Sequence, residues 1–572
     1  MPTVLFLLLR RLRMPLIVLI ISYAVSILGL TLIPGQDDQG QPWRMDFFHA
    51  FYFVSFMGST IGFGEIPYPF TDGQRLWTTF AMYSAVIAWL YAIGAMLATV
   101  QSPPFQQALR QAAFKRSVKR IDTPFFLVCG YGDTGSLLVR ALVERGVQSV
   151  VVDIDPIRIN TLETEDLPLS VPGLCANAAD SETLKAAGLD HPSCIGLIAL
   201  TNVDHVNLMA AIASKLISPQ LQVICRAETH DSEANMASFG TNYIINPYDS
   251  FSERLALALN APSLFLLTEW LTDDRYRGSD VAVIPPQGRW IVCGYGRCGK
   301  ALTKHLNDAG LPVTVIEANP KGTSPPQDTV IGRGTEAVTL RQAGVDDGDV
   351  AGLVAATDDD ANNLSIIMTA RELNRDLFTI ARQNHRANDM VFTASQSHWL
   401  IQPGAIIARE VLSRITTPLL YEFLDTARRQ DDAWGKALVN SIGAVVGDEY
   451  PHAWAVTVEA RQAPALVAML AQDTQITLEA LLKDPQRNTR MLAIVPLLLK
   501  RDGQLQLTPP LETRLQVDDC LLFCGLKKCE QLLGGSLESI YTLNYLLTGK
   551  TQPQGTIMRW LSGLPPIPKV RA

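Results

Sequence analysis

Two long stretches without charge lie near the start of the chain. Pro15 to Ile33 contains no charged residue, and neither does Leu76 to Val100. Each is close to or above the roughly 20 residues that a helix needs to cross the hydrocarbon core of a bilayer. Either stretch alone could be a buried core helix, but two such stretches are hard to place in a soluble domain. The pattern therefore predicts two transmembrane helices.

A shorter apolar stretch, Phe47 to Met57, lies between the two spans and is too short to cross the membrane. Irregular backbone at membrane depth is tolerated only where protein or a water-filled cavity surrounds it. We therefore expect a re-entrant helix that leads into the loop Thr60 to Glu65. A surface loop with chance glycines is the alternative.

Basic residues flank the pair of spans on both outer sides. They are Arg10, Arg11 and Arg13 before the first span and Lys115, Arg116, Lys119 and Arg120 after the second. An excess of Lys and Arg marks cytoplasmic flanks. The sequence thus predicts a multi-pass protein of the cell (inner) membrane with both termini in the cytoplasm. A cleavable signal peptide is not expected, because the first span is too long for its hydrophobic region.

Beyond the spans, apolar strands alternate with amphipathic helices, and the pattern occurs twice. Phe125 to Gly135 and Trp290 to Gly299 each predict a strand that runs into a glycine loop, and the two loops lie 164 residues apart. Later matches, such as Arg226 with Arg382, are 156 residues apart because the second copy has lost eight residues after its second strand. Alternating strands and helices predict two doubly wound α/β domains with parallel sheets.

Each glycine loop follows a strand, opens a helix and has an acid about 20 residues after it, as the dinucleotide fingerprint requires. Glycines let the backbone approach a pyrophosphate, the helix N-terminus supplies unpaired N–H groups, and the acid binds ribose hydroxyls. The residues expected at a nucleotide are Gly130, Gly132, Asp133, Thr134, Gly135 and Asp153 in the first copy and Gly294, Gly296, Arg297, Gly299 and Glu317 in the second. A Rossmann fold with a vestigial site is the alternative.

The last part of the chain has a different pattern. Ala453 to Val458, Met491 to Leu499 and Cys520 to Gly525 predict strands, and the stretches from Leu466 to Ala471 and from Ile476 to Lys483 predict helices. This pattern indicates an α+β lobe. The sequence assigns no role to the tail from residue 531 to 572.

Composition narrows the possible partners. The net charge of −8 argues against a nucleic-acid partner, because phosphate binding draws on a surplus of Lys and Arg. The nine cysteines match no standard zinc spacing, so we expect reduced cytosolic thiols. A chain of 572 residues, 48% hydrophobic and 18% charged, fits several domains and a mixed membrane and soluble protein.

The loop Thr60, Ile61, Gly62, Phe63, Gly64, Glu65 resembles the Thr-Val-Gly-Tyr-Gly-Asp signature of the two-transmembrane potassium channels. The resemblance implies a selectivity filter from Thr60 to Gly64 in a homotetramer. In it, the backbone carbonyls of Thr60, Ile61, Gly62 and Phe63, with the Thr60 hydroxyl, form stacked potassium sites. Phe63 replaces a tyrosine whose phenol braces the filter, and Glu65 replaces the shorter aspartate. These changes leave open a weakly selective cation channel of the same architecture.

The stretch from Asn177 to Gly188, with its counterpart from Gly332 to Gly344, resembles RCK domains, which regulate potassium conductance. The resemblance covers nearly all of residues 124 to 425, and the whole chain is similar to tandem-RCK prokaryotic channels of the GsuK type. It implies a ring of eight RCK (TrkA-N-like) domains below a four-fold pore. It also implies a channel rather than an enzyme, gated by NAD or an adenine nucleotide.

We expect a membrane α-helical pore domain followed by two Rossmann-like RCK domains and an α+β lobe. The expected boundaries are 1–104 for the pore, 105–123 for a linker, 124–270 for the first RCK domain, 271–288 for a connector, 289–430 for the second RCK domain and 431–572 for the lobe and tail. Pro103 and Pro104 end the second span. Gly94, its only glycine, is a candidate bend for an inner gate, or a small residue that permits close helix packing.

Calcium is a second ligand to consider, since some RCK domains gate through carboxylates near their last matched strand. Glu228 falls where such an acid is expected, but the neighbouring Arg226 would repel the ion. Asp358, Asp359 and Asp360 form an acidic turn that fits a solvated loop. Arg226 and Arg382 could instead face nucleotide phosphates, which guanidinium groups bind in bidentate fashion, or have structural partners.

Two other classes of protein share parts of this pattern. A membrane-anchored NAD-dependent oxidoreductase would use the same glycine loops, but no acid/base constellation accompanies them and the Thr60 to Glu65 loop would stay unexplained. A regulatory subunit of a potassium transporter shares the RCK fold but has no spans or filter of its own. The sequence does not choose between NAD, NADH, ADP and ATP, or say whether the ligand opens the gate.

Overall fold

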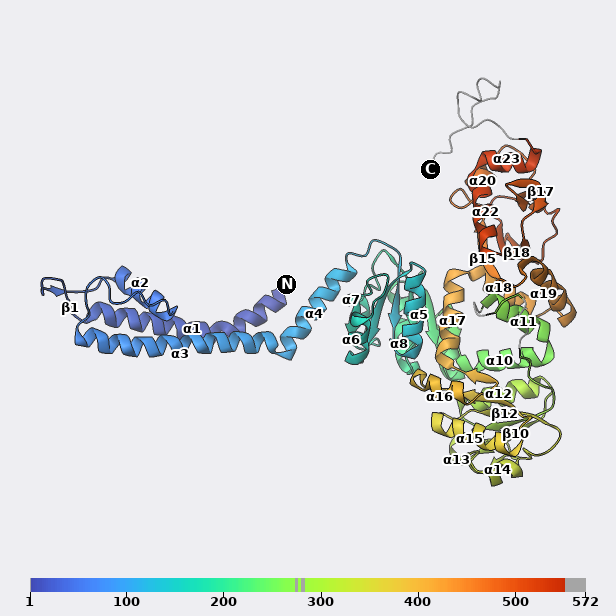
Figure 1. Ribbon diagram of the computed structural model, residues 1–572, viewed down its shortest axis with the longest axis horizontal. Coiled ribbons are helices and arrows are strands. Elements are labelled where there is room, and N and C mark those ends of the chain that lie inside the picture. Colours follow the sequence, from blue (N-terminus) through green and yellow to red (C-terminus); the bar gives the residue numbers. More distant parts are fainter. Residues whose placement is uncertain (1, 273–275, 279–282, 551–572) are drawn as a thin grey trace, which may run out of the picture. The chain divides into compact units, whose positions relative to one another are not determined.

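The computed structural model describes residues 2–272, 276–278 and 283–550, and the chain divides into two compact units, up to Asp122 and from Thr123 (Figure 1). Each unit is described by itself. The predicted connector at 271–288 lies partly outside the described residues, and so does the end of the tail.

The first unit is helical. Its elements are α1 (Pro2–Leu32), a small hairpin of β1 (Gly35–Gln36) and β2 (Pro42–Trp43), α2 (Phe47–Gly58), α3 (Asp72–Gln101) and α4 (Pro103–Val118). Helices α1 and α3 lie side by side (Figure 1). Leu12–Leu32 and Asp72–Gln101 are long and apolar enough to cross a membrane, and α2 is the short apolar helix predicted between them. The predicted helical pore domain is confirmed.

Caps set the ends of these helices. Asp46 accepts a hydrogen bond from the His49 N–H at 2.8 Å and begins α2, and Thr71 forms a capping box with Gln74 at the start of α3. Helix α3 ends at Gln101, Ser102 follows it, and Pro103 occupies the first position of α4, where its missing N–H costs nothing. The prolines thus end one helix and begin another, so most of the linker is helical.

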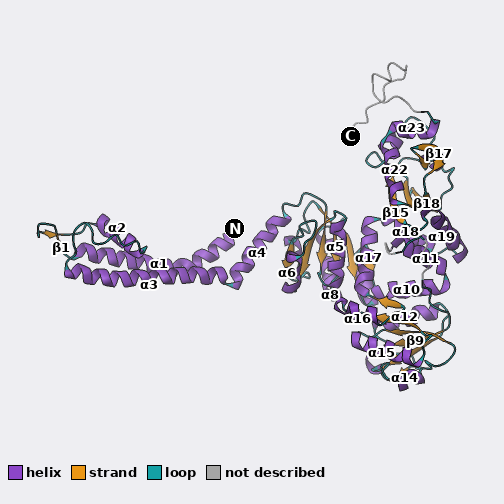
Figure 2. Cartoon of the chain, in the orientation of Figure 1, coloured by secondary structure: helices purple, strands orange, loops and turns teal. Residues whose placement is uncertain are grey.

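Each predicted α/β copy is a six-stranded sheet, parallel throughout, with helices on its faces (Figure 2). The first sheet has the order β5-β4-β3-β6-β7-β8. Its strands are β3 (Phe125–Cys129), β4 (Gln148–Asp153), β5 (Gly173–Cys175), β6 (Cys194–Ala199), β7 (Gln222–Arg226) and β8 (Tyr243–Ile245). Its helices are α5 (Asp133–Glu144), α6 (Pro156–Thr164), α7 (Ser181–Ala186), α8 (Asp204–Ile217) and α9 (His230–Ser238).

The second sheet repeats that order as β11-β10-β9-β12-β13-β14. Its strands are β9 (Arg289–Cys293), β10 (Val313–Glu317), β11 (Val330–Ile331), β12 (Val350–Ala355), β13 (Phe378–Arg382) and β14 (Trp399–Ile401). Its helices are α12 (Arg297–Asp308), α13 (Pro320–Thr323), α14 (Ala337–Gln342), α15 (Asp360–Leu373), the 3-10 turn η1 (Arg386–Asn388) and α16 (Asp389–Ala394). In both sheets the order reverses beside the first strand, where doubly wound folds bind ligands.

The helices that follow the two sheets are exchanged between the copies. Helix α10 (Pro247–Asn260) follows the first sheet but packs on α12, and its Phe251 and Leu255 join the core of the second copy. Helix α17 (Pro403–Thr416) follows the second sheet but packs on α5, where Ile407 joins the first core (Figure 1). The two copies therefore form a pair within one chain, held by burial of apolar surface.

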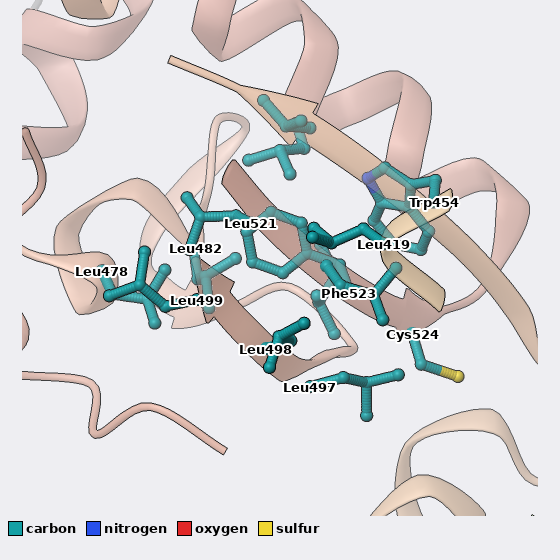
Figure 3. Close-up of a cluster of buried hydrophobic side chains, with 14 of the residues drawn as sticks. Leu419, Trp454, Leu478, Leu482, Leu497, Leu498, Leu499, Leu521, Phe523 and Cys524 are labelled. Carbon is teal, nitrogen blue, oxygen red and sulfur yellow. The ribbon is translucent and has the colours of Figure 1, made fainter. Parts of the chain in front are cut away.

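The C-terminal lobe is built on an antiparallel sheet with the order β15-β20-β18-β19. Helix α11 (Pro262–Thr272) and all the elements after α17 belong to this part of the protein. The later elements are α18 (Pro418–Ala427), α19 (Asp432–Val446), β15 (His452–Thr457), α20 (Pro464–Leu470), α21 (Leu478–Leu481), β16 (Lys483–Asp484) paired with β17 (Arg487–Met491), β18 (Ile494–Arg501), β19 (Gln504–Leu507), β20 (Cys520–Gly525), α22 (Lys527–Glu538) and α23 (Ile540–Thr548). Its core contains Leu498, Leu521 and Phe523 (Figure 3). Helix α11, which follows the first copy, also packs into this core.

Candidate ion pathway and nucleotide sites

The loop after α2 has an unusual backbone. Thr60, Gly62 and Gly64 have φ values of 63°, 69° and 98°, while Ile61 and Phe63 between them are not in the left-handed region. A positive φ is rare for a β-branched residue such as threonine. In a regular strand, successive carbonyl groups point to opposite sides. A positive φ at every second residue instead turns successive carbonyl groups toward the same side. Strain held in this way often marks a functional segment.

Two contacts fix this loop to its surroundings. The Phe63 ring packs edge-on against Phe56 of α2, with 5.4 Å between ring centroids. The Glu65 carboxylate accepts a hydrogen bond from the Phe70 N–H at 2.8 Å and pairs with the Arg75 guanidinium at 2.9 Å. Phe63 and Glu65, two of the three departures from the potassium-channel signature beside the mild change at Ile61, thus anchor the loop to α2 and α3. A cavity of about 500 Å³ beside them is lined by loop, α2 and α3 residues.

The second copy has an open glycine loop. Gly294 has a φ of +97°, and a Cβ on Gly299 would stand 1.9 Å from the Gly294 carbonyl oxygen, so α12 can lie against the loop only with glycine there. A Cβ on Gly296 would meet no atom within 4 Å. Glu317, at the end of β10, accepts a hydrogen bond from the Tyr295 N–H at 2.6 Å. The loop and the acid therefore lie together at the ends of β9 and β10.

A cavity of about 560 Å³ lies at this loop, at the carboxyl edge of the second sheet. It is lined by Gly294, Gly296 and Glu317, by Asp358, and by three arginines. The arginines are Arg297 at the start of α12, Arg333 after β11 and Arg382 at the end of β13. Guanidinium groups and the first N–H groups of a helix are both suited to phosphate. The arrangement fits a nucleotide with its phosphates at the loop.

The first copy has the same backbone. Gly130 has a φ of +102°, a Cβ on Gly135 would again stand 1.9 Å from the carbonyl oxygen of Gly130, and Asp153 accepts a hydrogen bond from the Tyr131 N–H at 2.5 Å. Thr134 is buried, and a Cβ on Gly404 of α17 would stand 3.0 Å from its hydroxyl oxygen. Its hydroxyl therefore faces the neighbouring copy.

Side chains of the first copy surround this loop differently. The Arg158 guanidinium would be 3.4 Å from a Cβ on Gly132, and it pairs with Asp153 at 3.4 Å and with Asp155 at 3.6 Å. Asp133 occupies the helix start that Arg297 occupies in the second copy, and its carboxylate accepts a hydrogen bond from the Arg386 N–H at 3.3 Å. In the first copy an arginine of the protein thus lies at the glycine loop, with acids around it.

Comparison with known proteins finds family models in three stretches of the chain. Residues 14–102 match the ion channel family model, and residues 126–247 and 290–403 each match the TrkA-N domain model. "Potassium channel protein 1" of Methanocaldococcus jannaschii is 24% identical over 297 residues, which cover 50% of this chain and 84% of that protein. The "voltage-gated potassium channel Kch" of Escherichia coli is 24% identical over 221 residues, 38% of this chain and 50% of Kch.

Among solved structures, the "GsuK Channel" aligns over 96% of this chain and 100% of its own, with 16% identity and a TM-score of 0.47. The "GsuK channel bound to NAD" aligns over 94% and 100%, with 15% identity and a TM-score of 0.45. The decisive observation is the pore model followed by two TrkA-N models in one chain. The chain belongs to the two-transmembrane potassium channels with RCK domains. It is a membrane protein and a channel rather than an oxidoreductase.

Calcium at Glu228 of this channel is not supported. The Glu228 side chain is buried and pairs with two guanidinium groups, Arg226 of its own copy and Arg297 of the second copy. These cations occupy the oxygens that an ion would need. Arg226 therefore has a structural partner, whereas Arg382 lines the cavity and donates a hydrogen bond to the Tyr248 hydroxyl at 3.0 Å.

The acidic turn of the channel's second copy is only partly a solvated loop. Asp359 caps α15, and Asp358 lines the cavity, but Asp360 is buried. Burial by itself would raise the pKa of Asp360, yet hydrogen bonds from Asn384, Asn388 and the His385 N–H outweigh it and hold the pKa below its ordinary value. The expectation of a solvated turn is therefore wrong for Asp360, which joins two strand ends.

Sequence reasoning missed Arg158 and Arg333, the two residues that most distinguish the glycine loops. Arg333 could have been found from topology, since residues just after parallel strands meet at one edge of the sheet. Arg158 gave no such signal, because it lies within α6. Gly94 lies inside the continuous helix α3, and a Cβ there would meet no atom within 4 Å.

Proposed function

We propose that the protein is a homotetrameric, nucleotide-gated potassium channel whose selectivity filter is formed by Thr60, Ile61, Gly62, Phe63 and Gly64. The observation that carries the proposal is the alternation of φ at Thr60, Gly62 and Gly64 directly after a short helix between two apolar helices. Four such loops around an axis would present rings of carbonyl oxygens that replace the hydration shell of an ion. The relatives named potassium channels support potassium as that ion.

The tetramer is supported by apolar surface that a single chain leaves exposed. Phe47, Phe48, Phe51 and Tyr52 of α2 are each about half exposed or more. Neighbouring copies around a pore would cover this face, and lipid would cover the outer faces of α1 and α3. Both termini are proposed to lie in the cytoplasm, because Lys115, Arg116, Lys119 and Arg120 follow the second span.

We place the principal nucleotide site in the second copy, at Gly294, Gly296, Arg297, Gly299 and Glu317. Its support is the open loop and the cavity of about 560 Å³ with three arginines. The first copy, at Gly130, Gly132, Asp133, Gly135 and Asp153, is the weaker site because Arg158 lies where phosphate would approach. NAD and ADP are the ligands named for the two GsuK complexes.

The proposed coupling runs through Arg297. This side chain pairs with Glu228 of the first copy and also lines the nucleotide cavity. A phosphate in the cavity would compete with Glu228 for the guanidinium and so alter the contact between the two copies. A coupling of about 1 to 3 kcal/mol per site is the usual scale, and several sites in one ring would add.

Conduction is tested with potassium flux into vesicles that contain the purified full-length channel. Gly62→Ala places a Cβ at a positive φ in the filter and should reduce the flux at least tenfold. Gly40→Ala is the matched control, since Gly40 has a φ of +75° and open space around it but lies outside the filter. Flux that survives Gly62→Ala unchanged, or NADH turnover without any flux, contradicts the channel.

Gating is tested by adding NAD or ADP to the same vesicles. Glu228→Gln should alter the nucleotide response because it weakens the pair with Arg297, while flux without nucleotide persists. Glu253→Gln is a control, as this acid pairs with Arg428 at 3.4 Å, away from both loops. A nucleotide response identical in Glu228→Gln and in the unaltered channel contradicts the proposed coupling.

A further inference from the structure

A cluster of histidines and carboxylates lies between the two RCK copies, away from both glycine loops. Nδ1 of His230 lies 3.1 Å from Oε2 of Glu233 and 3.9 Å from Oδ2 of Asp249. One ligand atom from each of these three residues lies within 4.8 Å of the other two. Ligands at 2.0–2.2 Å around a tetrahedral ion would be about 3.3 Å apart. The three atoms are therefore close to the spacing of one metal site.

Two copies contribute to this cluster. His230 and Glu233 lie on α9 of the first copy, and Asp249 lies on α10, the helix exchanged onto the second copy. His305 lies on α12 of the second copy, with its Nε2 3.4 Å from Oδ1 of Asp249. Oδ1 of Asp249 is buried and makes no hydrogen bond. His305 is the group that approaches this oxygen, and the other oxygen of Asp249, Oδ2, is the one that lies toward His230.

The cluster opens into a large cavity of about 730 Å³, which is lined by all four residues. An ion could therefore enter from solvent. Lys304 also lines the cavity and is the cation nearest in sequence to His305. The two carboxylates of Glu233 and Asp249 offset its charge. Asn246 holds Glu233 by donating a hydrogen bond to Oε1 at 2.6 Å, which leaves Oε2 directed toward His230.

We propose that His230, Glu233 and Asp249 bind a divalent transition-metal ion of the zinc class, with His305 orienting Asp249 from the second copy. Imidazole together with carboxylate suits Zn²⁺ and its neighbours, whereas Ca²⁺ and Mg²⁺ prefer sites made of oxygen alone. In such sites a ligating group is typically held by a hydrogen-bonding residue behind it. The ion would join α9 and α10 and fix α12 beside them.

The internal repeat supplies a natural comparison. At the equivalent place, His230 is matched by Arg386, Glu233 by Asp389, Asp249 by Ala405 and His305 by Ala141. Gln383, Arg386, Asp389 and Ala405 line a cavity of only about 160 Å³ there. That place has one carboxylate and no histidine among the four positions, so it would not hold a metal. The proposal therefore predicts one zinc ion per chain rather than two.

The test is isothermal titration of the purified full-length channel with Zn²⁺ alone, without any flux measurement, so its outcome is independent of conduction and nucleotide gating. One ion per chain is expected. The double variant His230→Ala with Asp249→Asn should weaken binding at least 100-fold. His305→Ala should weaken it by about 10- to 100-fold, as is usual when a residue that holds a metal ligand is removed. His205→Ala is the control, because His205 is an exposed histidine of the same copy.

Thermal unfolding in the absence of zinc checks that each variant folds. Zinc should raise the unfolding midpoint of the unaltered channel and of His205→Ala, and not of the double variant, because an ion that binds only the folded state stabilises it. Zinc binding of equal strength in the double variant and the unaltered channel overturns the site. Displacement of Zn²⁺ by an equal concentration of Ca²⁺ overturns the class of metal.

Discussion

The two RCK copies have the same backbone at their glycine loops but opposite charges around them. In the second copy, Arg297 and Arg333 line an open cavity. In the first copy, Asp133 replaces Arg297, and Arg158 lies against the loop beside Asp153 and Asp155. Repetition of the sheet order shows that the fold depends on the glycines and the apolar strands. The side chains around the loop decide whether a phosphate would find cations there.

This difference implies different roles for the two copies of one chain. A site already held by its own arginine needs no ligand to be stable, so the first copy can act as a fixed partner. The second copy has an open cavity at its glycine loop, and the ion pair between Arg297 and Glu228 connects it to the first copy. A ligand changes an equilibrium only by binding one state better than another. In the proposed mechanism, this asymmetry directs the response to the contact between the copies.

The largest effect is expected where the copies are alike. Gly299→Val and Gly135→Val each place a Cβ 1.9 Å from a backbone carbonyl oxygen, which cannot move away without displacing the loop. Each should destabilise its copy by more than about 4 kcal/mol and abolish the folded protein. Thermal unfolding and gel filtration measure this. Gly348→Val is the control, because its Cβ would meet no atom. A folded Gly135→Val protein would mean that only the second loop is tightly packed.

The second largest effect is on nucleotide affinity, and it should differ between the two copies. Gly296→Val should weaken the affinity for the nucleotide at least 100-fold with little change in the stability of the protein, because the new side chain fills open space at the loop. Gly132→Val should have little effect on binding, since Arg158 already lies there. Isothermal titration with NAD and ADP measures both. Equal losses in the two variants would show that both copies bind, and that the open cavity does not mark the principal site.

A buried acid gives a smaller contrast in stability. Asp360→Asn replaces acceptors of three or more hydrogen bonds and should cost about 1 to 3 kcal/mol. The equivalent Asp204→Asn should cost less, because Asp204 is only half-buried. Since the folded pKa of Asp360 is lowered, its stabilisation is present above the ordinary pKa of 3.8 and is lost as the pH falls below it. Chemical unfolding at pH 7 and pH 3 measures this; equal costs contradict the ranking.

The smallest effect tests the first loop directly. Gly322 of the second copy stands where the first copy has Arg158. Arg158→Gly should therefore open the first loop and add a second, weaker nucleotide site, about tenfold weaker because Asp133 and Asp155 remain. Titration would then give two ligands per chain instead of one. Arg145→Gly is the matched control, because it removes another exposed arginine of the same copy. An unchanged stoichiometry means that Arg158 does not close the loop.

Local sequence predicted much of the fold. The strand before the first glycine loop is apolar and buried throughout, and the strand before the second is so after its half-buried Arg289, as central parallel strands require. The amphipathic pattern predicts helices from Leu137 to Arg145 and from Ala301 to Ala309. The helices begin four residues earlier, at Asp133 and Arg297, because loop residues already form the first turn. In the lobe, β18 begins at Ile494 rather than Met491, since the preceding residues pair in a separate ribbon.

The sequence by itself determined the two spans, the glycine loop from Thr60 to Glu65 and the repeated fingerprint, because these depend on residue types at short spacing. Only the tertiary structure decided that α10 and α17 are exchanged between the copies and that Glu228 forms ion pairs with both Arg226 and Arg297. It also decided that Arg158 lies against one glycine loop while the other loop is open. These contacts join residues far apart in the chain. Their formation depends on how apolar helix faces pack between copies, and spacing along the sequence does not record that.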